Sequence, residues 1–252
     1  MGPLVRLDFA GGVARVTLND PARLNAISYR MTQDFNQALD EAERSARALI
    51  LTGEGRAFCS GAAVTEMDAW PPDALRTILN PLLTRLHDFK LPVVTVVNGL
   101  AAGFACSLAL LGDIILAAEN AYFLFAFSQV GLVPDGNASF LLPRLVGRVR
   151  SAELMLLGER LPANTALAWG LVNRVLPGPE LEPEAMRLAQ KLANGPASFA
   201  ATRRLLWQGL EDDWLQHLEA EAVEQEAAQR TEDHREGVAA FKEKRSPRFM
   251  GR

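Results

Sequence analysis

Residues 93–118 read VVTVVNGLAAGFACSLALLGDIILAA. The β-branched run 93–97 predicts a strand, and the small residues of 98–103 predict a loop. A short apolar helix is expected over 105–111 and a second strand over 114–118. Although the run is apolar enough to raise the question of a membrane span, its asparagine, glycines and aspartate divide it. We therefore expect the buried centre of a soluble α/β domain.

The same plan occurs earlier in the chain. Residues 48–52 form a short apolar strand, the glycine-containing loop 53–63 follows it, and a helix is predicted over 73–88. A strand–strand–helix unit therefore repeats along the chain. Strands that recur in this way are expected to pair in parallel between repeats.

The two ends of the chain have different patterns. Residues 4–9 and 13–18 alternate in hydrophobicity around an Ala-Gly-Gly turn, which predicts a hairpin, and Ser28 can cap a helix that ends near Ser45. From residue 196 onward, helix formers dominate. We divide the chain into a core, 1–195, and a helical segment, 196–252. That segment serves oligomer contacts or simply presents a solvated face.

Length and composition exclude several classes of protein. The chain has 252 residues, of which 49% are hydrophobic and 22% charged, as expected for one large globular domain. A net charge of −4 gives no electrostatic reason to expect a nucleic-acid partner. The first 14 residues lack the continuous apolar stretch of a signal peptide, and only two cysteines occur. We expect a cytoplasmic protein.

The common catalytic and metal-binding motifs are absent from the sequence. There is no G-x-S-x-G, P-loop, H-E-x-x-H or C-x-x-C motif. His87, His217 and His234 lie far apart on predicted helices, and we interpret them as surface residues. Cys106 follows a glycine loop, as a nucleophile could. Because no histidine is near in sequence, we interpret it as a small packing residue.

The loops 53–63 and 98–106 share a form that suggests chemistry. Each follows a strand, is rich in small residues and leads toward a helix. Small residues allow a ligand to approach the backbone, and free amides at a helix start favour negative charge. Two such amides could form an oxyanion hole. Tight structural turns account for the same pattern equally well.

Several segments resemble the signatures of the crotonase (enoyl-CoA hydratase/isomerase) family, in the family's order and over nearly the whole chain. They are 53–62 (GEGRAFCSGA), 98–103 (NGLAAG), 113–117 (DIILA), 131–136 (GLVPDG), 168–172 (AWGLV) and 241–245 (FKEKR). The resemblance implies an α/β fold, the crotonase (ClpP-like) spiral of strand–strand–helix repeats. It also implies that 196–252 is a trimerisation region and that the protein forms trimers or hexamers.

The resemblance also assigns roles to individual residues. The oxyanion amides correspond to Ala62 and Phe104. Residues that contact the CoA part of a substrate correspond to Arg23, Asn25, Ala26 and, from a neighbouring subunit, Phe241 and Lys242. Arg23 and Lys242 are equally compatible with ordinary surface charges.

Three positions depart from the family pattern. Hydratases carry catalytic glutamates where this chain has Ser107 and Phe127, two positions that would still contact the substrate. Hydration needs acid–base groups that hold a water, and phenylalanine cannot act as one. Simple hydration is therefore not expected. Ala63 also replaces an aspartate that is common in the family, with no loss of a base.

One carboxylate remains, Asp135 in the segment Val-Pro-Asp-Gly. It matches the acidic residue of a branch that contains Δ3,Δ2-enoyl-CoA isomerases and epoxyphenylacetyl-CoA isomerases. Neighbouring apolar residues, which we take to be Phe123, Phe125, Phe127 and Leu132, would raise its pKa. Pro-Asp-Gly is also good turn chemistry, which is the alternative explanation.

The sequence therefore predicts an enoyl-CoA isomerase that uses Asp135 as its base. A hydratase or thioester hydrolase with water held by Ser107 and Asp135 is the alternative, as is a non-catalytic acyl-CoA-binding protein. No metal or redox cofactor is expected, because CoA arrives as part of the substrate. The acyl pocket is expected to include the helix 73–88, Trp70 and Phe140.

Overall fold

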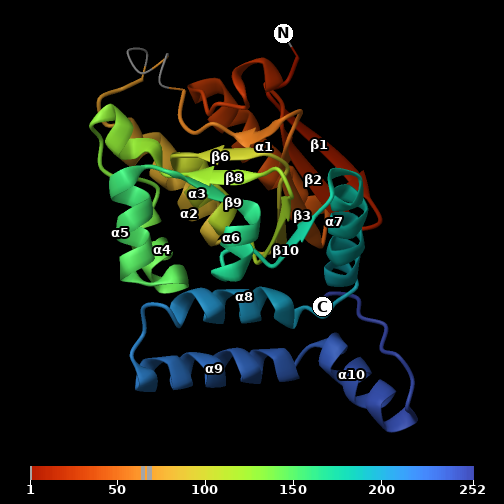
Figure 1. Ribbon diagram of the computed structural model, residues 1–252. Helices are drawn as coiled ribbons and strands as arrows, with labels where there is room; N and C mark the ends of the chain where they lie inside the picture. The colour runs from red at the N-terminus through yellow and green to blue at the C-terminus, as the bar shows by residue number, and fades with distance from the viewer. Residues whose placement is uncertain (1, 64–65, 67–69) are drawn as a thin grey trace.

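The centre of the molecule is a spiral of short strands. The computed structural model describes residues 2–63, 66 and 70–252. Successive turns of the spiral consist of β3 (Ala48–Gly53) and β4 (Ala57–Cys59), then β5 (Val93–Val97) and β6 (Leu100–Ala102), then β7 (Ile114–Ala118) and β8 (Tyr122–Leu124). The first strand of each turn joins one sheet and the second strand joins another, and within each sheet these strands pair in parallel. This confirms the predicted spiral (Figure 1).

The strands differ in how well the sequence reveals them. Every residue of β3 and β5 is buried, and strands buried on both faces read as continuous apolar runs. The strands β4 and β6 lie inside the segments that we expected to be loops. Each has three residues with small or mixed side chains, which is too short for a periodic pattern to appear.

Other strands complete the two sheets. β1 (Val5–Ala10) and β2 (Val13–Leu18) form the predicted antiparallel hairpin at one edge of the larger sheet, and β10 (Arg174–Leu176) lies at the other edge. In the smaller sheet, β9 (Arg160–Pro162) pairs antiparallel with β8.

Helices surround the two sheets. The helix α1 (Tyr29–Ser45) begins as predicted, because Met31 N donates a 3.2 Å hydrogen bond to the capping Ser28 Oγ. The predicted helix over 73–88 consists of a π-helical turn, Leu75–Leu79, followed by α2 (Asn80–His87). The others around the sheets are α3 (Phe104–Leu110), α4 (Ala138–Val146), α5 (Arg148–Leu157), α6 (Ala163–Ala168) and α7 (Gly178–Ala193).

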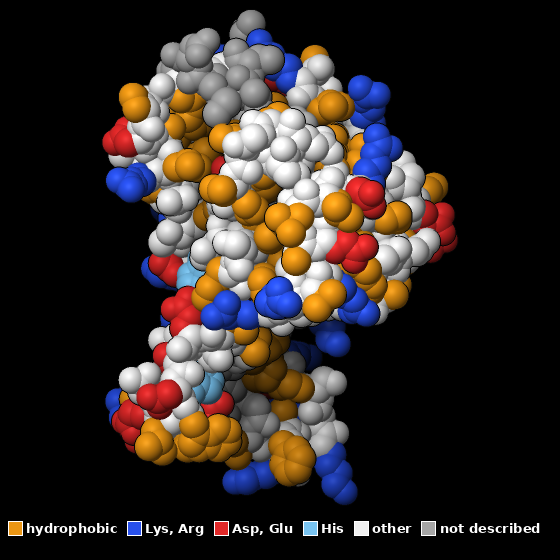
Figure 2. Space-filling view, turned by 60° about the vertical axis from the view of Figure 1, so that its left-hand side comes forward, with side chains coloured by type: hydrophobic (Ala, Val, Ile, Leu, Met, Phe, Trp, Pro, Cys, Tyr) orange, Lys and Arg blue, Asp and Glu red, His pale blue; other side chains and the backbone are white. Residues whose placement is uncertain are grey.

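The C-terminal region is helical, as expected. Figure 1 shows α8 (Ser198–Gln208) against the underside of the body and α9 (Trp214–Gln229) beneath it, with α10 (Glu232–Glu243) beyond the end of α9. The side chains of Trp214, Leu215 and Val223 on α9 are exposed. The space-filling view shows a narrow waist between the body and these helices, with hydrophobic side chains on the lower part (Figure 2). The role of 196–252 in oligomer contacts stays a prediction.

Arg203 joins α8 to the body. Its side chain is only 4% exposed, and its Nε donates a 2.9 Å hydrogen bond to Asp113 Oδ2. The guanidinium also donates to four backbone carbonyl groups, those of Leu86, His87, Phe89 and Leu111. These carbonyls lie at or just beyond the C-terminal ends of α2 and α3, where few helical N–H donors remain. Arg203 therefore satisfies two helix ends at once.

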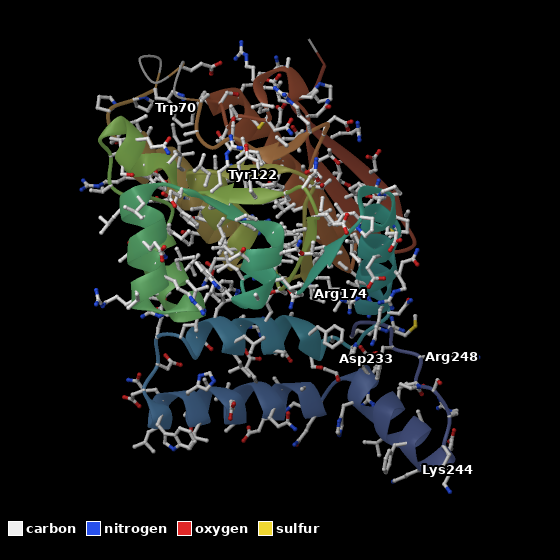
Figure 3. The ribbon with its side chains drawn as sticks, viewed as in Figure 1. Trp70, Tyr122, Arg174, Asp233, Lys244 and Arg248 are labelled. Carbon is white, nitrogen blue, oxygen red and sulfur yellow. The ribbon has the colours of Figure 1, made fainter. Side chains whose placement is uncertain are left out.

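Asp233, at the start of α10, holds the last residues of the chain. Its buried carboxylate accepts hydrogen bonds from the backbone N–H groups of Ala197, Met250 and Gly251. Burial alone would raise the pKa of Asp233, but these three donors outweigh it and hold the pKa below its usual range. Figure 3 shows Asp233 between α8 and the segment that carries Arg248.

The apolar run 91–118 contains β5, α3 and β7, as predicted, and β6 lies in the part that was expected to be a loop. No helix within the described ranges is both long and apolar enough to cross a membrane.

Candidate active site

The two glycine loops meet where β4 and β6 end. Gly61 has φ = +95°, and a methyl group added there would lie 2.7 Å from Ala102 O and 3.7 Å from Phe104 N. Only glycine allows this approach, because a Cβ would overlap the neighbouring carbonyl oxygen. The backbone between Gly61 and Ala62 therefore lies beside the start of α3.

The orientation of the Gly61–Ala62 peptide follows from its hydrogen bonds. Ile27 N donates to Gly61 O at 2.8 Å, and Ala63 N donates to Ile27 O at 2.9 Å. In a trans peptide the N–H points opposite to the C=O, so the Ala62 N–H points away from Ile27. In the part of the chain that the structure describes, neither Ala62 N nor Phe104 N donates to a backbone carbonyl. Both amides are available for the oxyanion role.

Both cysteines belong to these loops as packing residues. Gly61 N donates to Cys59 Sγ at 3.3 Å, and Cys106 Sγ donates to Ala101 O at 3.1 Å. Burial raises the pKa of each thiol to about 12. A thiol that stays protonated is a poor nucleophile, so the interpretation of Cys106 as a packing residue agrees with the structure.

Asp135 lies in the wall of a cavity of about 750 Å³. The cavity is bounded by α2, by the segment 132–141 and by α8. The Oδ1 atom of Asp135 is buried and has no hydrogen-bond partner among the described residues. Burial raises the pKa of Asp135 to about 6. A carboxyl group with this pKa can both accept and return a proton near neutral pH.

The surroundings of Asp135 differ in part from our prediction. Leu132 lines the same cavity, but Phe123 and Phe125 are fully buried in the core and do not line it. Phe127 is buried with its ring near Gly103. A methyl group on Gly136 would lie 3.1 Å from Ser107 Oγ. The Asp135 segment therefore packs over Ser107, whose buried hydroxyl has no partner within the described chain.

The raised pKa of Asp135 predicts that its charge destabilises the fold. In the unfolded chain Asp135 ionises near its ordinary pKa of about 4, whereas in the folded protein it ionises only near about 6. The free energy of unfolding therefore falls as the pH rises from about 4 to 6, and it stays lower above about pH 6. We expect Asp135→Asn to raise the free energy of unfolding by on the order of 2 kcal/mol at neutral pH and to leave it unchanged near about pH 4. Thermal unfolding midpoints at the two pH values check this. An equal difference at both would contradict it.

Two of the residues assigned to CoA binding lie at the outer side of the first loop. Arg23 is exposed and forms an ion pair with Glu66, and Ala26 is half-buried. The buried Asn25 side chain instead holds the loop, because its Nδ2 donates to Glu54 O (2.9 Å) and Ala57 O (2.8 Å). Its Oδ1 accepts from Asp20 N. The Asn25 side chain thus shapes the loop, and Arg23 and Ala26 remain accessible to a ligand.

Phe241 and Lys242 lie apart from these loops. Both are exposed on α10, Phe241 at 86%, and α10 lies at the lower right of Figure 1, far from α4, which Asp135 precedes. Lys244 marks this end of the molecule in Figure 3. Within one chain the structure does not bring Phe241 and Lys242 together with Asp135.

Sequence reasoning missed part of the cavity wall. His87, interpreted as a surface residue, is partly buried and lines the cavity with Asp135, as does Trp207 of α8. Phe140 and residues of α2 also line it, as expected. Trp70 does not, because its ring packs edge-on against Tyr29 at 6.5 Å instead, near the top of the body (Figure 3). In the described ranges no group of His, Cys, Asp and Glu side chains is arranged to hold a metal ion.

Known proteins resemble this chain along its whole length. A family model described as "Enoyl-CoA hydratase/isomerase" matches residues 8–252. The 1,2-epoxyphenylacetyl-CoA isomerase of Escherichia coli (strain K12) is 40% identical in an alignment 251 positions long that covers 96% of this chain and 96% of its own. The 2,3-dehydroadipyl-CoA hydratase of the same organism is 34% identical over 95% of this chain and 96% of its own.

A solved structure also resembles this chain over its whole length. The crystal structure of an enoyl-CoA hydratase from Bacillus anthracis superposes with a TM-score of 0.93 at 29% sequence identity. The match covers 99% of this chain and 100% of that chain.

Proposed function

Because this chain belongs to the enoyl-CoA hydratase/isomerase family, we propose that it is an enoyl-CoA isomerase, in which Asp135 moves a proton along the acyl chain. The observation that carries the proposal is the position of Asp135. It lines a cavity of about 750 Å³, and the adjacent Gly136 packs against Ser107 of α3, the helix that begins at Phe104. Its pKa of about 6 suits a base that also returns the proton. A single carboxylate is enough for isomerisation, because the proton that is removed at one carbon is returned at another.

The proposed mechanism uses the two loop amides to stabilise charge. The thioester oxygen would accept hydrogen bonds from the N–H groups of Ala62 and Phe104, which lie beside each other and are otherwise free of backbone partners in the described chain. Removal of the α proton then gives an enolate whose oxygen these donors stabilise. Asp135 returns the proton at the γ carbon, which shifts the double bond.

The remaining parts of the proposal concern ligands and assembly. CoA enters as part of the substrate, and the chain's own residues supply the acid–base chemistry without a metal or redox cofactor. Arg23 and Ala26 would contact CoA in the same chain, and Phe241 and Lys242 would contact CoA bound by a neighbouring copy. We therefore propose a homotrimer, or a dimer of trimers, in the cytoplasm.

A paired assay tests the reaction. Purified enzyme is given 3-enoyl-CoA and, separately, 2-enoyl-CoA, and product masses are followed. We expect conversion of the 3-enoyl ester without a mass change and no addition of water to the 2-enoyl ester. We also expect kcat/KM to fall below about pH 6 as Asp135 becomes protonated. Addition of water at a comparable rate would instead support a hydratase, the activity named for one of the relatives above.

A further inference from the structure

The cavity beside Asp135 has a defined direction. Gly136, next to Asp135, lies against Leu83, because a methyl group on Gly136 would be 3.2 Å from Leu83 Cδ1. His87 follows Leu83 by four residues on α2, about one helical turn further along. The cavity therefore runs from Asp135 along α2 toward His87.

Aromatic rings form the far wall of this cavity. The rings of His87 and Trp207 pack together with centroids 4.9 Å apart and an interplanar angle of 52°. Phe140 contributes a third ring to the lining. Leu83, Leu111 and Leu141 line the same cavity together with the polar residues Asn80, Thr84 and Ser139, so its wall is partly apolar before the aromatic rings.

Charged groups also reach this cavity. Asp88 and Glu211 belong to its lining. Asp88 directly follows His87 in sequence, and Glu211 lies four residues after Trp207. A long unbranched acyl chain that passed the rings would meet these carboxylates, which give an alkyl group no favourable contact. An acyl group that ends at the rings does not reach these two carboxylates.

The aromatic wall is held in place from both sides. Arg203, one turn before Trp207 on α8, donates to the carbonyl groups of Leu86 and His87. The Nδ1 atom of His87 lies within hydrogen-bonding distance of Asp88 Oδ1, at 2.6 Å. The Arg203 hydrogen bonds thus anchor the helix that carries Trp207 to the end of α2, beside His87.

We propose that this cavity selects acyl groups that end in a ring, with Trp207 and His87 as the specificity-determining wall. The inference rests on the proposed function, because it takes the reacting carbons to lie beside Asp135. Aromatic rings packed edge-to-face or offset gain stability beyond their buried area, which corresponds to roughly two- to tenfold in affinity. A ring-bearing substrate should therefore be preferred over a linear one by about that factor.

The test compares two substrates with the same number of acyl carbons. One is 5-phenylpent-3-enoyl-CoA, whose ring is not conjugated with the double bond, and the other is 3-undecenoyl-CoA. We expect the wild-type enzyme to favour the phenyl ester in kcat/KM by roughly two- to tenfold. Trp207→Leu keeps an apolar side chain but loses the ring, and should reduce this ratio to about one. Trp207→Phe keeps a ring and should retain the preference.

Trp214→Leu is the matched control. Trp214 lies at the start of α9 and does not line the cavity, so the ratio of the two substrates should stay at the wild-type value. Far-UV circular dichroism and the thermal midpoint verify that each variant folds. A wild-type preference for the linear ester, or an unchanged ratio in Trp207→Leu, would overturn the inference.

A binding measurement separates this inference from the proposed reaction. The saturated esters 5-phenylpentanoyl-CoA and undecanoyl-CoA cannot isomerise, and their affinities are measured by calorimetry. If neither unsaturated ester is turned over, the proposed reaction is wrong. The inferred ring selectivity is then supported if 5-phenylpentanoyl-CoA binds more tightly than undecanoyl-CoA and Trp207→Leu removes the difference. It is wrong if the two saturated esters bind with equal affinity.

Discussion

Asp135→Ala is expected to lower kcat for 3-enoyl-CoA by about 10²- to 10⁴-fold, the range typical for loss of a positioned acid–base group. The dissociation constant for a saturated acyl-CoA should change little, because the amides of Ala62 and Phe104 and the cavity walls remain. The loss of kcat is expected to be large because no second carboxylate can replace Asp135: the two other positions where this family places one hold Ser107 and Phe127. Single-turnover kinetics with product separation measure the chemical step, and calorimetry measures binding.

A second carboxylate from the same cavity provides the control. Glu211 lines the cavity near Trp207, and Glu211→Ala should cost far less activity than Asp135→Ala. If Asp135→Ala retained turnover within about tenfold, the base would be another group. His87 would be the next residue to test, because it lines the same cavity.

The second large effect concerns stability. Arg203→Met keeps the apolar stem of the side chain but removes the guanidinium that pairs with Asp113 and four carbonyl groups. Breaking a buried ion pair by removing one partner typically costs about 3–5 kcal/mol, since the other groups stay buried without partners. We expect the free energy of unfolding to fall by about this amount, measured by urea denaturation.

The neighbouring residue is a close control for this variant. Arg204 lies on the same helix, but it is half-exposed and its ion pair with Glu224 is near the surface. Arg204→Met should therefore cost less than about 1 kcal/mol. Similar losses for the two variants would show that Arg203 does not join α8 to the body as described. A loss confined to Arg203→Met would support that role.

Much of the fold could be predicted from the sequence because its elements have a periodic pattern. The hairpin of β1 and β2, the helix capped by Ser28 and the buried strand β5 each have one. The strands β4 and β6 do not, because three residues cannot establish a period. Their existence depends on pairing with neighbours far along the chain, which local patterns do not encode.

The site was predictable only in part. Spacing suggested two glycine loops without excluding plain turns, and the resemblance supplied the specific roles of Ala62, Phe104 and Asp135. Nothing in the sequence links Arg203 to Asp113, since 90 residues separate them and each resembles an ordinary surface charge. For the same reason His87 gave no signal. Its place in the cavity depends on how α8 packs against α2.

The spiral has a consequence for how this chemistry can diverge. The amide of Ala62 comes after β4 on the first turn, the amide of Phe104 after β6 on the second, and Asp135 after β8 on the third. Activation of the thioester and handling of the proton are therefore encoded in separate, successive stretches of the gene. Mutation can change the third stretch while the Ala62 and Phe104 amides of the first two stretches are kept. One scaffold can therefore evolve new reactions on the same class of ester.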